Sequence, residues 1–302
     1  MQNASDGVKT SPISNYIWET QTPPSLLWHY TNADALLGIA RNQVLWCTEY
    51  RYLNDRKEIS AFAIHLIARI REELVAIFGR ETSDSIAEFV TTLYNTWNIF
   101  ICSFCLDADR NEHWYQYAGK AGYSLGFDTY QLKALADSQG FTLGPTLYGE
   151  STAINIATAV LKDNLHKLEA IERPITESNY NEVVSFLCRL TLGYAPFFKA
   201  ESFEREREWR LVRATGIDGD NKMQFRSKLP FGLVGYLPFS LLAKKERQDQ
   251  PNHNERNTLI PRLMIGPGNE TTEFTRAAHA YRLLAQNGFD AEVGETSSSL
   301  RL

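Results

Sequence analysis

A short apolar run in the middle of the chain, IFICSF at 99–104, restricts the possible folds more than any other feature. Its residues do not alternate between apolar and polar, which is the pattern of a β-strand that is buried on both of its faces. A second strand-like run at 123–127 follows it, after an aromatic segment at 113–117 with helical spacing. We therefore expect a sheet in which this strand is covered on both faces and in which 123–127 is its partner.

Strand-like and helical segments alternate along the rest of the chain. Strands are expected at 26–31, 44–48, 206–212, 232–238 and 259–266, with a short final strand in the tail. Helices are expected after the capping residue Asn32 and at 58–78, 83–96, 152–171, 179–194 and 270–286. This order predicts an α+β protein with a mixed or antiparallel sheet and helical insertions at about 56–97 and 150–196. Residues 1–25 are predicted to form a loose arm, and 26–302 a single domain.

Composition excludes several classes of protein. The chain has 302 residues, 43% of them hydrophobic and 22% charged, which is typical of a packed globular domain. A net charge of −5 gives no overall basic field for nucleic acid or anionic membranes. No run reaches the roughly 20 apolar residues of a membrane span, and four cysteines are too few for a secreted disulfide framework. We expect a cytoplasmic protein without a membrane partner; the oligomeric state stays open.

The segment Glu206-Arg207-Glu208-Trp209-Arg210 is the strongest candidate for chemistry. In a strand, Glu206, Glu208 and Arg210 would share one face. Two carboxylates about 7 Å apart repel each other by roughly 2 kcal/mol at an effective dielectric near 20, which would raise the pKa of one of them by more than a unit. Such a pair can divide its roles, one carboxylate remaining ionised and the other accepting a proton. The alternative is an exposed edge strand whose charges prevent aggregation.

Other candidate residues each have a structural alternative. His29 can bind a sugar hydroxyl or hydrogen-bond a neighbouring strand. The aromatic residues of 113–117 can stack on a nicotinamide or a base, or can belong to the core. Asp55 and Glu58 have the spacing of a capping box. Lys199, Arg205 and Arg207 can bind phosphates of a cofactor or of a nucleic acid.

Three short motifs are rejected from their context. Gly122-Tyr123-Ser124-Leu125-Gly126 matches the nucleophile elbow of serine hydrolases, but a helix end precedes it and a strand continues after it. The spacing Cys102-x-x-Cys105 is that of a zinc knuckle without the second pair of ligands, so no metal site is expected. Gly266-Pro267-Gly268 precedes a helix with Glu270 in its first turn, where a carboxylate would repel a phosphate.

Five pieces of the sequence, taken in order, resemble a known family. They are LWHYT, LWCTEYRYLNDRKE, ICSF, HWYQYAGKAGYSLGFD and EREWRLV. Together they resemble the bacterial domain-of-unknown-function family 2971, from about residue 26 to the C-terminus, although the helical region at 128–197 offers no landmark of that family. The order of elements in turn resembles the ADP-ribosyltransferase fold, which implies a split and strongly bent sheet and a site for NAD.

The resemblance to ADP-ribosyltransferases implies roles for individual residues. Glu208 would be the catalytic carboxylate that stabilises the ribose of NAD, and Glu206 would deprotonate the acceptor. The residues implied to bind the cofactor are His29, Tyr30, Thr31, Ser103, Trp114, Tyr117 and Arg210. The implied activity is NAD-dependent modification of an intracellular protein or nucleic acid by a toxin or phage-defence effector. This step rests on fold analogy. The alternatives are an NAD glycohydrolase and a non-catalytic module that binds nucleotides or proteins.

Overall fold

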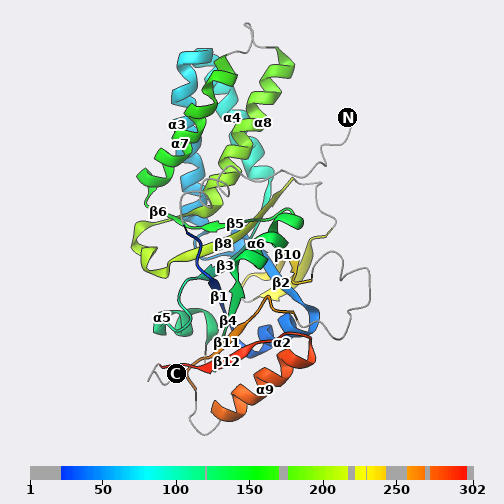
Figure 1. Ribbon diagram of the computed structural model, residues 1–302. Coiled ribbons are helices and arrows are strands. Elements are labelled where there is room, and N and C mark those ends of the chain that lie inside the picture. The colour runs from blue at the N-terminus through cyan, green and yellow to red at the C-terminus, as the bar shows by residue number, and fades with distance from the viewer. Residues whose placement is uncertain are drawn as a thin grey trace.

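The computed structural model describes residues 22–119, 121–169, 176–216, 222–228, 230–242, 257–268 and 273–297, with the side chains of 164–169 and 273 excepted. The expected loose arm at 1–25 therefore lies almost wholly outside the described residues, and Glu270 also lies outside them. The described part is a mixed α and β structure in which a helical bundle stands on a large sheet (Figure 1).

The large sheet is mixed and mostly antiparallel. Its main path runs β12-β11-β4-β1-β3-β2-β10-β9, and β8 joins β3 to β5. The strands are β1 (Leu26–Thr31), β2 (Val44–Glu49), β3 (Asn98–Cys105), β4 (Tyr123–Asp128), β5 (Thr142–Pro145), β8 (Glu208–Thr215), β9 (Gln224–Lys228), β10 (Gly232–Ser240), β11 (Arg262–Ile265) and β12 (Glu292–Glu295). Among the described strands of this sheet, only β11 and β12 pair in parallel. A separate two-stranded sheet pairs β6 (Leu147–Tyr148) with β7 (Phe198–Lys199).

Strand β3 contributes to the cores on both faces of the sheet, as its apolar sequence predicts, and the sheet divides beside it. On one side β8 pairs with it from Cys105 to Asn98. The other side is shared: β1 pairs with β3 only at Cys105, and β2 pairs with it only at Ile101 and Phe100. The stretch of β3 between these contacts has no partner strand there. The expected pairing of 99–104 with 123–127 is wrong, because β4 pairs with β1 and β11 instead.

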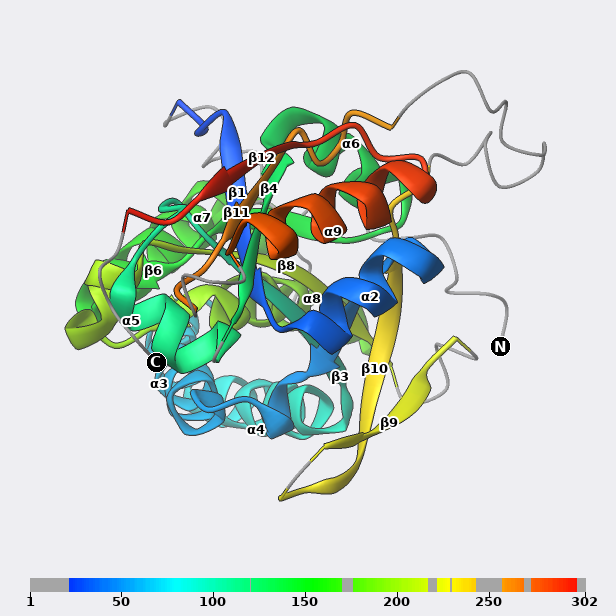
Figure 2. The ribbon, with the colours of Figure 1, turned by 90° about the horizontal axis from the view of Figure 1, so that it is seen from below.

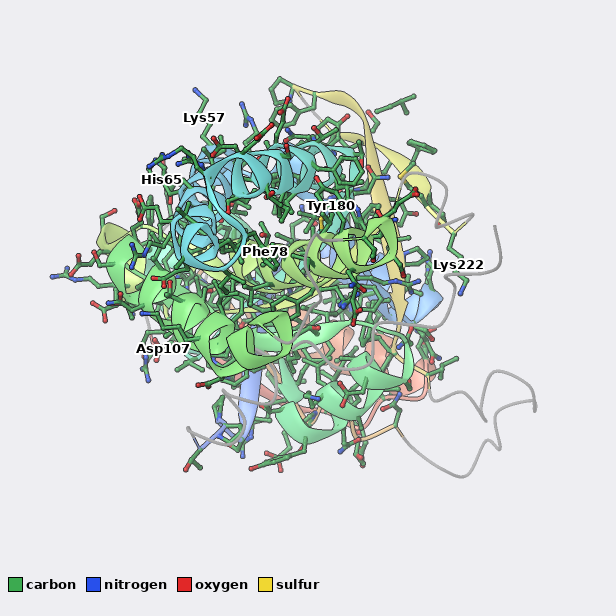
Figure 3. All side chains as sticks on the ribbon, turned by 90° about the horizontal axis from the view of Figure 1, so that it is seen from above. Lys57, His65, Phe78, Asp107, Tyr180 and Lys222 are labelled. Carbon is green, nitrogen blue, oxygen red and sulfur yellow. The ribbon has the colours of Figure 1, made fainter. Side chains whose placement is uncertain are left out.

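Four long helices cover one face of the sheet. They are α3 (Arg56–Phe78), α4 (Arg80–Thr96), α7 (Glu150–Glu169) and α8 (Glu177–Tyr194). Their apolar residues form one core with Ile99, Ile101 and Val212 of the sheet, and Phe62 of α3 stacks on Phe198 of β7 with ring centroids 4.3 Å apart. Figure 3, which looks onto the bundle from above, shows Phe78 and Tyr180 among these helices.

The opposite face carries the shorter helices α2 (Ala33–Asn42), α6 (Thr129–Ser138) and α9 (Glu273–Gln286) (Figure 2). They enclose a second core with the sheet. The predicted cap of α2 is present, since the side chain of Asn32 accepts a hydrogen bond from the amide of Ala35 at 2.9 Å. No helix within the described ranges is long and apolar enough to cross a membrane.

Strand β8 begins later than predicted. Residues Glu201–Glu206 form a 3₁₀ helix, η4, and Arg207 has a left-handed backbone with φ of 47°. A residue in that conformation turns the chain by itself, so Glu206 cannot continue the pleat of Glu208. The sequence pattern did not indicate α6 or the strands β5, β6, β7 and β9, of which β9 is an edge strand.

Candidate functional site

A pocket of about 310 Å³ opens where the helical bundle meets the sheet, beside the division next to β3. Its size lies at the lower end of the range for sites that bind small molecules, roughly 300–1,000 Å³. Strands β1, β3, β7, β8 and β9 contribute to its wall, together with the start of α3 and the segment before it. Four carboxylates line it against two lysines: Asp55, Glu58, Glu206 and Glu208 against Lys199 and Lys228.

Glu208 is buried at this pocket and is held by Arg210 on the same face of β8. The guanidinium Nε lies 3.0 Å from Glu208 Oε1, and its NH2 nitrogen lies 3.1 Å from Oε2. Arg210 is 1% exposed, and it also donates to the carbonyl oxygens of Pro196 and Phe198 and to Asp55. Because Arg210 does not line the pocket and its donors are engaged within the protein, the structure corrects its expected cofactor-binding role: Arg210 positions Glu208.

Lys199 joins the two carboxylates of the E-x-E segment. Its Nζ lies 2.6 Å from Glu206 Oε2 and 2.9 Å from Glu208 Oε2. The predicted repulsion between the two carboxylates is therefore compensated. Burial acts to raise the pKa of Glu208, but Arg210 and Lys199 outweigh it and lower that pKa to about 2. Glu208 is thus the carboxylate that stays ionised, and the ammonium of Lys199, a candidate for binding phosphate, is engaged by the two carboxylates.

The predicted capping box before α3 is also absent. The side chain of Asp55 makes no cap hydrogen bond and instead pairs with Arg210. Glu58 accepts a hydrogen bond from the amide of Ala200 at 3.1 Å, next to Lys199. Sequence reasoning missed Asp55 and Glu58 as pocket residues, although the acidic pair in LNDRKE was a visible signal.

Aromatic side chains also line the pocket. Tyr30 and His113 line the pocket with their rings 5.1 Å apart, and the exposed Tyr117 donates from its hydroxyl to Glu206 at 3.1 Å. Trp114 is fully buried behind Tyr30 at a centroid distance of 4.6 Å, and its indole donates to Asp109. Since Trp114 is not accessible, its expected cofactor-stacking role is corrected to packing. His113, which the sequence analysis did not single out by itself, is 3% exposed, and its Nδ1 has no hydrogen-bond partner among the described residues.

His29 lies in the division of the sheet. Its Nδ1 is 2.9 Å from the carbonyl oxygen of Ser103, so the imidazole satisfies a β3 carbonyl at the stretch without a partner strand. His29 and Glu208 line the same pocket, as does the exposed Ser103. Thr31 is 4% exposed and does not line the pocket. The expected role of Thr31 in cofactor binding is therefore corrected to a structural one.

The rejected motifs have structural explanations. Ser124 is the second residue of β4 and is fully buried, so it cannot serve as an exposed nucleophile. Cys102 and Cys105 are three residues apart in a strand, which directs them to opposite faces. All four cysteines are buried free thiols. Within the described part of the chain, no group of three or more potential ligands could hold a metal ion.

The lowered pKa of Glu208 predicts how stability depends on pH. The folded pKa of about 2 lies below the ordinary value of 4.5, so the ionised carboxylate contributes stability that is complete above about pH 4.5 and is lost as the pH falls towards 2. The contribution is on the order of 3 kcal/mol. Denaturant unfolding at several pH values should show the free-energy gap between the wild type and Glu208→Gln narrowing below pH 4.5. A gap that is constant with pH would contradict this assignment.

Comparison with known proteins gives a match to part of the chain. No curated protein and no solved structure matches the chain. Residues 113–211 match the model of the family described as Protein of unknown function (DUF2971), a segment that runs from pocket residue His113 through Lys199, Glu206 and Glu208.

Proposed function

We propose that the pocket binds NAD and that the protein is an ADP-ribosyltransferase-like enzyme. The observation that carries the proposal is Glu208, a carboxylate that is 7% exposed yet remains ionised because Arg210 and Lys199 hold it in place. Cleavage of the bond between nicotinamide and ribose develops positive charge on the ribose. A fixed anion at that position stabilises the transition state without having to reorganise.

The charge of the pocket supports a ligand of this kind. Four carboxylates against two lysines leave an excess of negative charge, which favours the positively charged nicotinamide ring of NAD over an anion at this end. Tyr30, His113 and Tyr117 supply aromatic surface for such a ring. A volume of about 310 Å³ suits the nicotinamide riboside half of the dinucleotide. The remaining half would extend beyond the rim.

Different residues would then act in different steps of the transfer reaction. Glu208 faces the ribose as the C–N bond breaks and nicotinamide leaves, and His29 and Ser103, which line the same pocket, contact the ribose. Glu206, whose side chain is 16% exposed, accepts the proton of the acceptor nucleophile as its new bond to the ribose forms. The acceptor would be an intracellular protein or nucleic acid. A role as a toxin or defence effector rests on the resemblance of the sequence alone.

Incubation of the purified protein with NAD labelled in the adenine moiety tests the proposal. The expected result is release of nicotinamide together with label on macromolecules of an added cell extract. Free labelled ADP-ribose without labelled macromolecules would identify a glycohydrolase, in which water replaces the acceptor. Intact NAD, together with no heat of binding in calorimetry, would refute the assignment to an NAD-consuming enzyme.

A further inference from the structure

The edge strand β9 carries two cations on the same face of the sheet as the pocket. Arg226 pairs with Val234 and Lys228 with Gly232 of β10, and two-residue alternation directs both side chains to one face. Contacts confirm the direction: Arg226 donates to Thr48 Oγ1 at 2.9 Å, and Lys228 lines the pocket. The β9–β10 hairpin projects from the sheet (Figure 2), with Lys228 next to its turn and Arg226 closer to β2, so the two cations follow one another along β9 from the pocket wall towards β2.

These two cations are not neutralised within the described part of the chain. Neither forms an ion pair with a carboxylate there, and the Arg226 Nε is buried without a hydrogen-bond partner. Burial, followed by the nearby charge of Arg226, lowers the pKa of Lys228. Burial likewise lowers the pKa of Arg226. A pair of like charges this close gains free energy when an anion binds between them.

Aromatic rings hold the two cations in position before any ligand arrives. Arg226 lies 5.0 Å above the Trp46 ring, which itself contacts Tyr236 at 5.2 Å. Lys228 lies 5.9 Å from the centroid of Phe231 and donates to the carbonyl oxygen of Tyr52 at 3.3 Å. Cations that are already restrained lose less conformational entropy on binding than free lysines and arginines do.

We propose that Arg226 and Lys228 form an anion subsite that binds the diphosphate of a dinucleotide. This inference rests on the proposed function and extends it. The pocket then has opposite charge at its two ends, with carboxylates around the cationic nicotinamide riboside and cations around the diphosphate. Lys228 belongs to both parts of the site, because it lines the pocket and lies on the same face of β9 as Arg226.

The backbone of a single-stranded nucleic acid has the same phosphate chemistry, but the surroundings fit it less well. Strand-binding surfaces combine a charged groove with aromatic rings on which bases stack. Here Arg226 covers Trp46, and Arg56 and Lys228 both lie about the ring of Phe231. Trp46 and Phe231 are partly exposed, but a cation already lies about each ring, so a base that stacked there would compete with that cation.

Calorimetry of the full chain with two probes tests the subsite. ADP-ribose contains the diphosphate, whereas nicotinamide riboside contains no phosphate. Lys228→Gln is expected to weaken ADP-ribose binding by about tenfold or more, the loss typical of one charged hydrogen bond, and not to weaken the binding of nicotinamide riboside, because removal of a cation from the pocket wall does not disfavour a cationic ligand. Lys228→Arg should restore the affinity for ADP-ribose. Lys222→Gln is the matched control, because Lys222 is exposed and does not line the pocket. Figure 3 shows it on a different side of the molecule from Lys57, which lies between the pocket residues Asp55 and Glu58 in the sequence.

The outcomes separate this inference from the proposed function. An unchanged affinity for ADP-ribose in both Lys228→Gln and Arg226→Gln would overturn the subsite, even if NAD is cleaved. Loss of ADP-ribose binding in those variants, with thermal melting unchanged, would support the subsite, even if NAD is not cleaved. A single-stranded oligonucleotide that binds more tightly than ADP-ribose, and that loses affinity in the same variants, would overturn the dinucleotide assignment in favour of nucleic acid.

Discussion

Replacement of Glu208 by glutamine should reduce the rate of NAD cleavage by about 100- to 1,000-fold, the loss that follows removal of one preorganised electrostatic group from an active site. Glutamine keeps the size of the side chain and removes only the charge that would face the ribose. Binding of NAD should change much less than the rate, because the carboxylate acts mainly as the bond breaks. The measurement is single-turnover release of nicotinamide at saturating NAD, with binding followed separately by calorimetry.

Glu204→Gln is the control for this prediction. Glu204 lies four residues earlier in η4, is exposed and does not line the pocket. Its replacement removes the same charge from the same part of the chain and should leave the rate unchanged. Equal rates for Glu208→Gln and the wild type would exclude Glu208 as the catalytic carboxylate. The folded state of Glu208→Gln is expected to persist, because Lys199 keeps Glu206 as a partner and Arg210 keeps Asp55.

The sequence predicted the elements whose signals are local. The apolar run at 99–104 belongs to the central strand β3, the boundaries of β1 are those of its aromatic run, and Asn32 caps the following helix. The start of β8 was not predictable in the same way. It depends on the left-handed backbone of Arg207, a conformation that residues other than glycine seldom adopt and that no pattern at this position indicates.

The candidate site was predicted only in part, because only contacts between residues close in sequence could be inferred. Glu206 and Glu208 are neighbours in sequence, so their proximity could be inferred. Their charge partners come from elsewhere: Asp55 is 155 residues away from Arg210 in the chain, and Lys199 reaches the site from the separate strand β7. Burial was equally unpredictable for Trp114, since aromatic residues at helical spacing can face either a ligand or the core. Only the tertiary structure shows which of these applies.

The largest effect on stability is expected for Arg210→Met. Arg210 compensates the charges of Asp55 and Glu208 and donates to two backbone carbonyl groups, all within the buried boundary between the bundle and the sheet. Methionine fills a similar volume but leaves buried carboxylates without that partner, a change that typically costs about 3–5 kcal/mol. The free energy of unfolding, measured by denaturant titration at pH 7, should fall by that amount. The free energy of unfolding of Arg210→Lys should lie between those of the wild type and Arg210→Met, because lysine keeps the positive charge and loses the bidentate contact with Glu208.

Arg205→Met is the control for this prediction. Arg205 is an exposed residue of η4, and the same substitution there should change stability by less than about 0.5 kcal/mol. The loss in Arg210→Met should also shrink as the pH falls below 4.5, because protonation of Glu208 removes one of the charges left without compensation. A loss that is independent of pH would show that Arg210 stabilises the fold through its packing and carbonyl contacts alone. A loss that diminishes in acid would tie the stability of the bundle on the sheet to the same ion cluster that keeps Glu208 ionised in the pocket.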